Sequence, residues 1–149
     1  MRAVVQRVSR AQVTADDAVV GRIGPGLLVY AAAAPDDADA DVAYLAEKVA
    51  HLRIFPDAEY KMNLSVLDAG GAVLLVSAFT VQADARKGRR PAFDGSASGP
   101  VAEPLIEKLV AAIRTYGLTV ATGRFGAHMH VESVNDGPIC VLLDSRRTF

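Results

Sequence analysis

Residues 77–81 combine residue types that suit ester or oxyanion chemistry. They read Ser-Ala-Phe-Thr-Val, and they follow an apolar run that is typical of a buried strand. Hydroxyl groups and free backbone N–H groups at the end of a strand can bind a carbonyl oxygen or stabilise an oxyanion. The same pattern also fits a plain strand end, so this segment alone leaves both interpretations open.

Two other segments have unusual residue combinations. Residues 135–138 read Asn-Asp-Gly-Pro between two apolar runs, which is ordinary turn chemistry, and a Gly-Pro pair at a hairpin tip can hold a cis peptide bond. Four basic residues stand within five positions of a Gly- and Pro-containing stretch: Arg86, Lys87, Arg89 and Arg90. Such a cluster suits contacts to a phosphate backbone, although charge runs also simply solvate loops.

The remaining nucleophile and metal-ligand types do not form a familiar site. His128 and His130 are expected to share one face of a strand, but no third ligand is evident. His51 fits the surface or packing of a helix, and Cys140 fits a small buried residue of an apolar strand. No G-x-S-x-G, P-loop or H-E-x-x-H pattern occurs. We therefore expect no metal and no cofactor.

The elements that must position these residues fit one domain, 1–149, because 149 residues is an ordinary domain length. Turn signals and apolar runs predict strands over residues 2–8, 11–15, 19–23, 27–34, 72–76, 119–122, 129–134 and 139–143. Three- and four-residue spacings predict one helix opening at 35–37 and another over 101–116, with a long exposed loop over 82–100. With strands joined mostly as hairpins, the sequence predicts an α+β fold. Its core is a mostly antiparallel, barrel-like sheet with two helices covering it.

Composition narrows the class of protein. Sixteen basic and seventeen acidic residues give a net charge of −1, which excludes a surface that is a polycation throughout. The single cysteine excludes an intramolecular disulfide and indicates a reducing compartment. No apolar run has the length of a membrane span, and the N-terminus does not resemble a signal peptide. We expect a cytoplasmic protein without membrane contacts.

Taken together, these segments resemble the D-aminoacyl-tRNA deacylase (D-tyrosyl-tRNA deacylase) family. The resemblance rests on the first eleven residues, the Gly-Pro-Gly-Leu-Leu-Val turn, Lys61-Met62-Asn63, the basic loop and Val134 to Pro138. In order and spacing it covers the chain from residue 1 to about residue 146. Where the family has Ser-Gln-Phe-Thr this chain has Ala78 in place of glutamine, and Ile139-Cys140 replaces the Val-Thr that follows Gly-Pro.

The resemblance implies a hydrolase that cleaves the ester of D-aminoacyl-tRNA, and of glycyl-tRNA mischarged on tRNA(Ala), into amino acid and tRNA. It implies a homodimer in which a cis Gly137-Pro138 pair enters the partner's pocket and excludes L-aminoacyl groups. In the family pattern Arg7 braces that pair, Asn135 belongs to the same motif, and the tRNA backbone meets the basic loop.

In the pocket itself, the resemblance implies that Phe125 and Met129 contact the terminal adenosine and that Ala78 contacts the substrate. Ser77 is expected to be catalytic together with Phe79 and Thr80. Backbone N–H groups around Phe79 and Thr80 would stabilise the oxyanion. Thr80 is then a nucleophile, or a positioning residue aided by the tRNA 2′-hydroxyl. Three alternatives remain: an editing hydrolase for achiral or L-aminoacyl-tRNA, a catalytically impaired tRNA-binding dimeric module, and a metal hydrolase at the two histidines.

Overall fold

The sheet is built around one long strand. The computed structural model describes all residues, 1–149, and β1 covers Arg2–Ala15. β3 (Gly26–Ala32) pairs antiparallel with the first half of β1, and β2 (Ala18–Ile23) pairs antiparallel with the second half. Asp16 and Asp17 join β1 to β2 with positive φ angles of 49° and 60°, as the expected two-residue turn requires.

The last strand corrects two expectations. β8 (His130–Asp144) runs antiparallel along nearly the whole of β1, with Val134 opposite Arg10 and Cys140 opposite Gln6. The predicted hairpin between 129–134 and 139–143 is therefore wrong, because both halves pair with the same neighbour and residues 136–139 form a bulge. The sequence also predicted two strands, 2–8 and 11–15, where the structure has the single strand β1. The strand is not divided because Arg10 continues the pairing with β8. Cys140 is exposed rather than buried.

Two strand pairs are parallel, which the expectation of mostly hairpin connections missed. β6 (Ala72–Ser77) lies parallel to β3, and β7 (Val120–Thr122) lies parallel to β6. Parallel neighbours need a crossover connection, and the two helices supply it. α1 (Asp39–His51) follows β3, and α2 (Gly99–Thr115) precedes β7.

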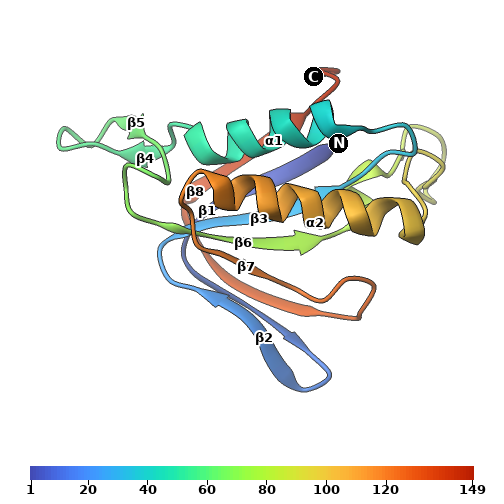
Figure 1. Cartoon of the computed structure of the whole chain (residues 1–149), viewed down its shortest axis with the longest axis horizontal. Helices are drawn as coiled ribbons and strands as arrows, with labels where there is room; N and C mark the ends of the chain where they lie inside the picture. The colour runs from blue at the N-terminus through green and yellow to red at the C-terminus, as the bar shows by residue number, and fades with distance from the viewer.

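Two smaller elements were not predicted. β4 (Phe55–Pro56) and β5 (Met62–Leu64) form a separate antiparallel hairpin within an expected loop. A 3₁₀ helix, η1 (Phe79–Gln82), follows β6 and ends at the first residue of the expected long loop. In Figure 1 the hairpin projects at the left, whereas β6 ends at the right.

Both helices lie side by side on one face of the sheet (Figure 1), and the main core fills the space between them and the strands. A second apolar cluster lies inside the curl of the sheet, where Leu28 and Leu74 pack against Val13. β2 closes toward β7 at this end. A Cβ at Gly21 would lie 2.4 Å from the Thr122 carbonyl oxygen, so only glycine permits this approach. The sheet is thus nearly a closed barrel, as predicted.

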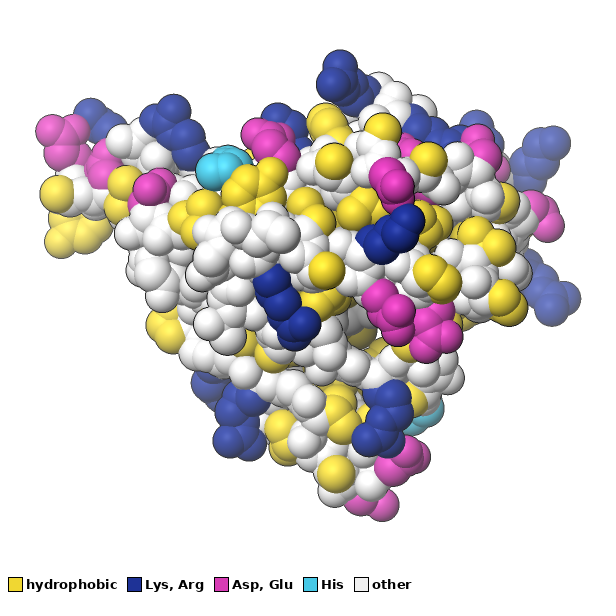
Figure 2. Space-filling model, in the orientation of Figure 1, with side chains coloured by type: hydrophobic (Ala, Val, Ile, Leu, Met, Phe, Trp, Pro, Cys, Tyr) yellow, Lys and Arg dark blue, Asp and Glu magenta, His cyan; other side chains and the backbone are white.

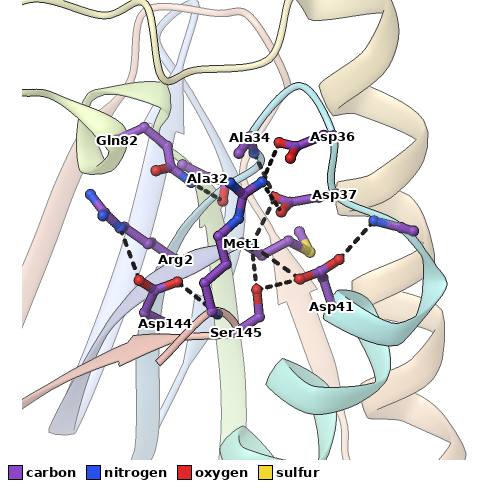
Figure 3. A network of polar contacts seen from close by, with 12 residues as sticks. Met1, Arg2, Ala32, Ala34, Asp36, Asp37, Asp41, Gln82, Asp144 and Ser145 are labelled. Carbon is purple, nitrogen blue, oxygen red and sulfur yellow. Dashed lines mark hydrogen bonds and ion pairs between the residues drawn. The ribbon is translucent and has the colours of Figure 1, made fainter. Parts of the chain in front are cut away.

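A polar network joins the two ends of the chain to the start of α1 (Figure 3). The Met1 ammonium lies 2.7 Å from the Asp37 carboxylate, both fully buried, and donates to Ser145 Oγ at 2.6 Å. Ser145 Oγ in turn donates to Asp41. Burial raises the pKa of Asp41, but hydrogen bonds from Ser145 Oγ and the Ala38 N–H lower it by more. The net result is a pKa below the ordinary range. None of the helices is long and apolar enough to cross a membrane.

Candidate active site where β6 leaves the sheet

The chain leaves the sheet abruptly after β6. Four buried residues, 73–76, precede the half-buried Ser77, and the Ala78 N–H still donates to the Ala31 carbonyl at 2.9 Å. η1 then begins at Phe79. The N–H groups of Phe79 and Thr80 stand at its start, where no preceding turn supplies a carbonyl acceptor. Two backbone donors are therefore free to bind a ligand oxygen.

These residues line a cavity of about 380 Å³. The loop between β7 and β8 and the first turn of α2 also line it. The structure brings together six of the residues predicted from sequence, and the cavity lining includes Ser77, Ala78, Phe79, Thr80, Phe125 and Met129. The Arg124 N–H donates to the Met129 sulfur at 3.4 Å, which holds Met129 against the turn that carries Phe125. The cavity volume falls in the range of small-molecule sites, at its lower end.

Seven further lining residues were missed because they are small and carry no reactive group. They come from the end of β3, the segment before α2, α2 itself and the loop between β7 and β8: Ala32, Ala33, Ala97, Gly99, Ala102, Gly126 and Ala127. Such residues carry no chemical signature in sequence. Their contribution is space, since larger side chains at these places would fill the cavity.

No Asp, Glu, His, Lys, Arg, Cys or Tyr lines the cavity. Its electrostatic character comes instead from backbone groups. The first turn of α2 borders it at Gly99, and the Ser98 side chain caps none of the N–H groups there. A helix N-terminus carries a partial positive charge, as do the free N–H groups of η1. This arrangement favours a carbonyl oxygen that becomes negative during reaction.

Two hydrogen bonds fix η1 against the rest of the molecule. Ser96 Oγ donates to the Phe79 carbonyl at 2.9 Å, and the buried Gln82 side chain donates to the Ala32 carbonyl at 3.4 Å (Figure 3). The segment after the basic loop is held too, because the Ala97 N–H donates to the Ala33 carbonyl. The donors at the start of η1 thus stand on a braced element.

The bulge at 136–139 lies far from this cavity within the same chain. The Gly137-Pro138 bond is cis, and both residues are exposed. Arg7 Nε donates to the Asp136 carbonyl at 3.2 Å, and the Asn135 side-chain amide donates to the carbonyls of Arg7 and Ile139. Thr14 of β1 pairs with His130, which directly follows the cavity residue Met129. Along β1, Thr14 lies roughly 23 Å from Arg7. Neither Gly137 nor Pro138 lines the cavity.

The four basic residues lie on an exposed loop outside the cavity. Arg86 makes a bidentate pair with Asp84, and these hydrogen bonds hold the pKa of the Asp84 carboxyl well below its usual range. Lys87, Arg89 and Arg90 form no ion pair. Dark-blue Lys and Arg side chains project from the right-hand edge of the molecule, near this loop (Figure 2).

Other groups of polar residues have different surroundings. His128 lies just before β8 rather than within a strand, and its ring meets the His130 ring edge to face at 5.1 Å. No group of three or more His, Cys, Asp or Glu side chains is placed to hold a metal ion. A larger cavity of about 890 Å³ lies between residues 82–95 and the C-terminal residues, where arginines and aspartates pair with one another.

The sequence also matches known proteins over most of its length. Residues 4–144 match the model of the D-Tyr-tRNA(Tyr) deacylase family. The chain is 56% identical over 149 residues to a D-aminoacyl-tRNA deacylase of Symbiobacterium thermophilum, covering 100% of this chain and 99% of that one.

Two solved structures share the fold. The c-Myc DNA unwinding element binding protein is 34% identical, with a TM-score of 0.91 over 97% of this chain and 98% of its own. A probable eukaryotic D-amino acid tRNA deacylase is 17% identical, with a TM-score of 0.84 over 95% and 97%, a likeness of fold alone. The family match over residues 4–144 and the 56% identity over the whole chain show that this chain belongs to the D-Tyr-tRNA(Tyr) deacylase family.

Proposed function

We propose that this protein hydrolyses the ester that joins a D-amino acid to the 3′ end of tRNA, which releases the amino acid and tRNA. The observation that carries the proposal is the cavity at the start of η1, where free backbone donors stand in a site without titratable side chains. Membership of the deacylase family supports the substrate class.

The reaction needs little beyond positioning and oxyanion stabilisation, because an aminoacyl ester is already activated. Water attacks the carbonyl carbon of the ester. The carbonyl oxygen, which becomes negative, turns toward the N–H groups of Phe79 and Thr80. One well-placed donor lowers the barrier by about 2.7–4 kcal/mol. The bond between the carbonyl carbon and the ribose 3′-oxygen then breaks, and the 3′-oxygen takes up the proton that the attacking water loses. Since no basic side chain lines the cavity, the neighbouring ribose 2′-hydroxyl assists, and Thr80 positions the reacting groups.

The adenosine of the substrate lies against Phe125 and Met129, which line the cavity. The departure at Ala78 removes a side-chain amide that the family has, but it leaves the backbone donors at Phe79 and Thr80 in place. The exposed basic loop, with Arg86, Lys87, Arg89 and Arg90, meets the phosphate backbone beyond the adenosine.

Selection against L-aminoacyl esters requires a second copy of the chain. The Gly137-Pro138 bulge is braced by Arg7 yet lies roughly 23 Å from the Met129 end of its own strand pair, so it reaches a cavity only across a dimer. A dimer also covers apolar side chains that β8 leaves exposed, Val134 and Leu142. The bulge then stands against the substrate α-carbon, where a D-residue presents hydrogen. Glycine presents hydrogen too, so glycyl-tRNA(Ala) is also cleaved.

The test is the release of amino acid from D-Tyr-tRNA, L-Tyr-tRNA and Gly-tRNA(Ala) by purified protein, with EDTA present. We expect cleavage of the D-ester and the glycyl ester only, at a rate that EDTA does not alter. An Ala102→Phe variant, which fills the cavity, is the matched control and should lose this activity. Equal cleavage of the L-ester would contradict the selection, and tRNA binding without cleavage of any ester would favour the catalytically impaired binding module.

A further inference from the structure

Two phenylalanine rings meet at the mouth of the cavity and are exposed to solvent. Phe79 is 56% exposed and Phe93 is 38% exposed, and their ring centroids lie 5.1 Å apart at an angle of 66°. Phe79 lines the cavity, whereas Phe93 does not. Single exposed apolar residues are common on protein surfaces, but a paired aromatic surface beside a binding cavity calls for a ligand.

In sequence, Phe79 precedes the basic loop and Phe93 follows it. Backbone hydrogen bonds between Asp84 and Ala92, at 2.8 Å in each direction, close the base of this loop. Phe93 directly follows this closed base, and three of the four cations that the loop carries form no ion pair. Aromatic rings beside unpaired cations are the combination that binds single-stranded nucleic acid, where rings stack on bases and cations meet phosphates.

The size of the cavity decides which nucleotide the rings contact. At about 380 Å³ it has room for a single aminoacyl-nucleoside end, so the preceding nucleotide must lie outside it. In the proposed complex the adenosine lies against Phe125 and Met129, which also line the cavity. The rim at Phe79 and Phe93 is the part of the mouth that continues toward the basic loop.

We propose that Phe93, held edge to face by Phe79, is a stacking platform for the base that precedes the terminal adenosine of the tRNA. This subsite rests on the proposed function, since it presumes that the tRNA 3′ end occupies the cavity. It gives the enzyme a contact to the single-stranded end of tRNA that does not depend on the amino acid.

The experiment compares three substrates: D-Tyr-tRNA, the same tRNA with an abasic nucleotide before the terminal adenosine, and 3′-O-D-tyrosyl-adenosine. Phe93→Ala should lower kcat/KM for D-Tyr-tRNA about 5- to 150-fold, mainly through KM, because one stacked base contributes about 1–3 kcal/mol. It should lower kcat/KM for the adenosine ester far less. With the wild type, kcat/KM for the abasic substrate should already be low. Phe93→Ala should lower that kcat/KM little further.

Two further variants separate stacking from structure. Phe93→Tyr should restore the preference for the intact tRNA, and Tyr60→Ala, an exposed aromatic on the β4–β5 hairpin, should leave it as in the wild type. An equal loss on D-Tyr-tRNA and the adenosine ester would overturn the inference, because Phe93 would then only support the cavity. If the wild type cleaves neither ester, the proposed function fails. The subsite is then tested by tRNA affinity, and equal Kd values for intact and abasic tRNA would overturn it.

Discussion

At the scale of single residues, Thr80 decides between two chemical routes. Its hydroxyl is one of two that line the cavity, and it makes no hydrogen bond within the chain. A nucleophilic threonine needs a base within reach, and no titratable side chain lines this cavity. The geometry therefore favours Thr80 as a positioning residue whose hydroxyl contacts the substrate.

We predict that Thr80→Val, which keeps the shape and removes the hydroxyl, lowers kcat on D-Tyr-tRNA only roughly 2- to 13-fold. That is the effect of one lost hydrogen bond of about 0.5–1.5 kcal/mol. Thr80→Ser keeps the hydroxyl and should stay active. The measurements are single-turnover rates and intact-protein mass spectra. A dead Thr80→Ser would refute the positioning role, as would complete loss in Thr80→Val together with an acyl adduct on the wild type.

The same scale shows what sequence patterns can reveal about the site. Thr80 was predicted because a hydroxyl at the end of a strand carries a chemical signature, whereas Phe125 and Met129 were predicted from the family resemblance. The small residues that make room for substrate, among them Ala33 and Ala102, carry none. Their importance follows from the cavity that they leave open, and that cavity exists only after folding.

At the scale of elements, long-range pairing limited the prediction. Both helices and most strands were predicted because their periodicity is local. The pairing of both halves of β8 with β1 was missed, because Asn135 to Pro138 supplies the same turn residues to a bulge as to a hairpin. The parallel β3–β6 pair was missed as well, since it depends on where α1 packs rather than on any residue in the strands.

The network between the chain ends and α1 also acts at this scale, and it predicts acid sensitivity. Burial raises the pKa of Asp144, but hydrogen bonds from Thr148 Oγ1 and the Arg146 N–H, with the Arg2 charge, lower it to below its ordinary range. Asp41 is lowered as well, as described above. A carboxyl group whose folded pKa is lowered stabilises the fold above its unfolded pKa and loses that contribution as pH falls through the folded pKa.

We therefore expect the free energy of unfolding to be nearly constant above about pH 5 and to fall below about pH 4. Urea unfolding at a series of pH values measures this. Asp144→Asn removes one titrating group and should make the fall shallower, by up to about 1.4 kcal/mol per pH unit. Equal slopes in the two proteins would mean that Asp144 does not stabilise the fold through its charge.

At the scale of the whole molecule, the cavity and the bulge belong to one site only if two chains share it. Gly137 has a φ of 128°, and a Cβ there would lie 2.5 Å from Ile139 Cγ1, so Gly137→Val must displace the bulge. Ala102→Phe fills the cavity instead. Each variant alone should form a dimer that is impaired on D-Tyr-tRNA. Both sites of such a dimer have the same defect, a filled cavity with Ala102→Phe or a displaced bulge with Gly137→Val.

A heterodimer of the two variants contains one site built from an intact cavity and an intact bulge. We predict that it regains about half of the wild-type activity per dimer, since a two-fold dimer has two equivalent sites. Different tags at the C-terminus, where Phe149 is 66% exposed, allow its isolation by tandem purification. Sedimentation then verifies the dimer. Activity equal to the mean of the two variant homodimers would place the complete site within one chain, and the roughly 23 Å between the bulge and the Met129 side of the cavity would then have to be closed by a movement of β8.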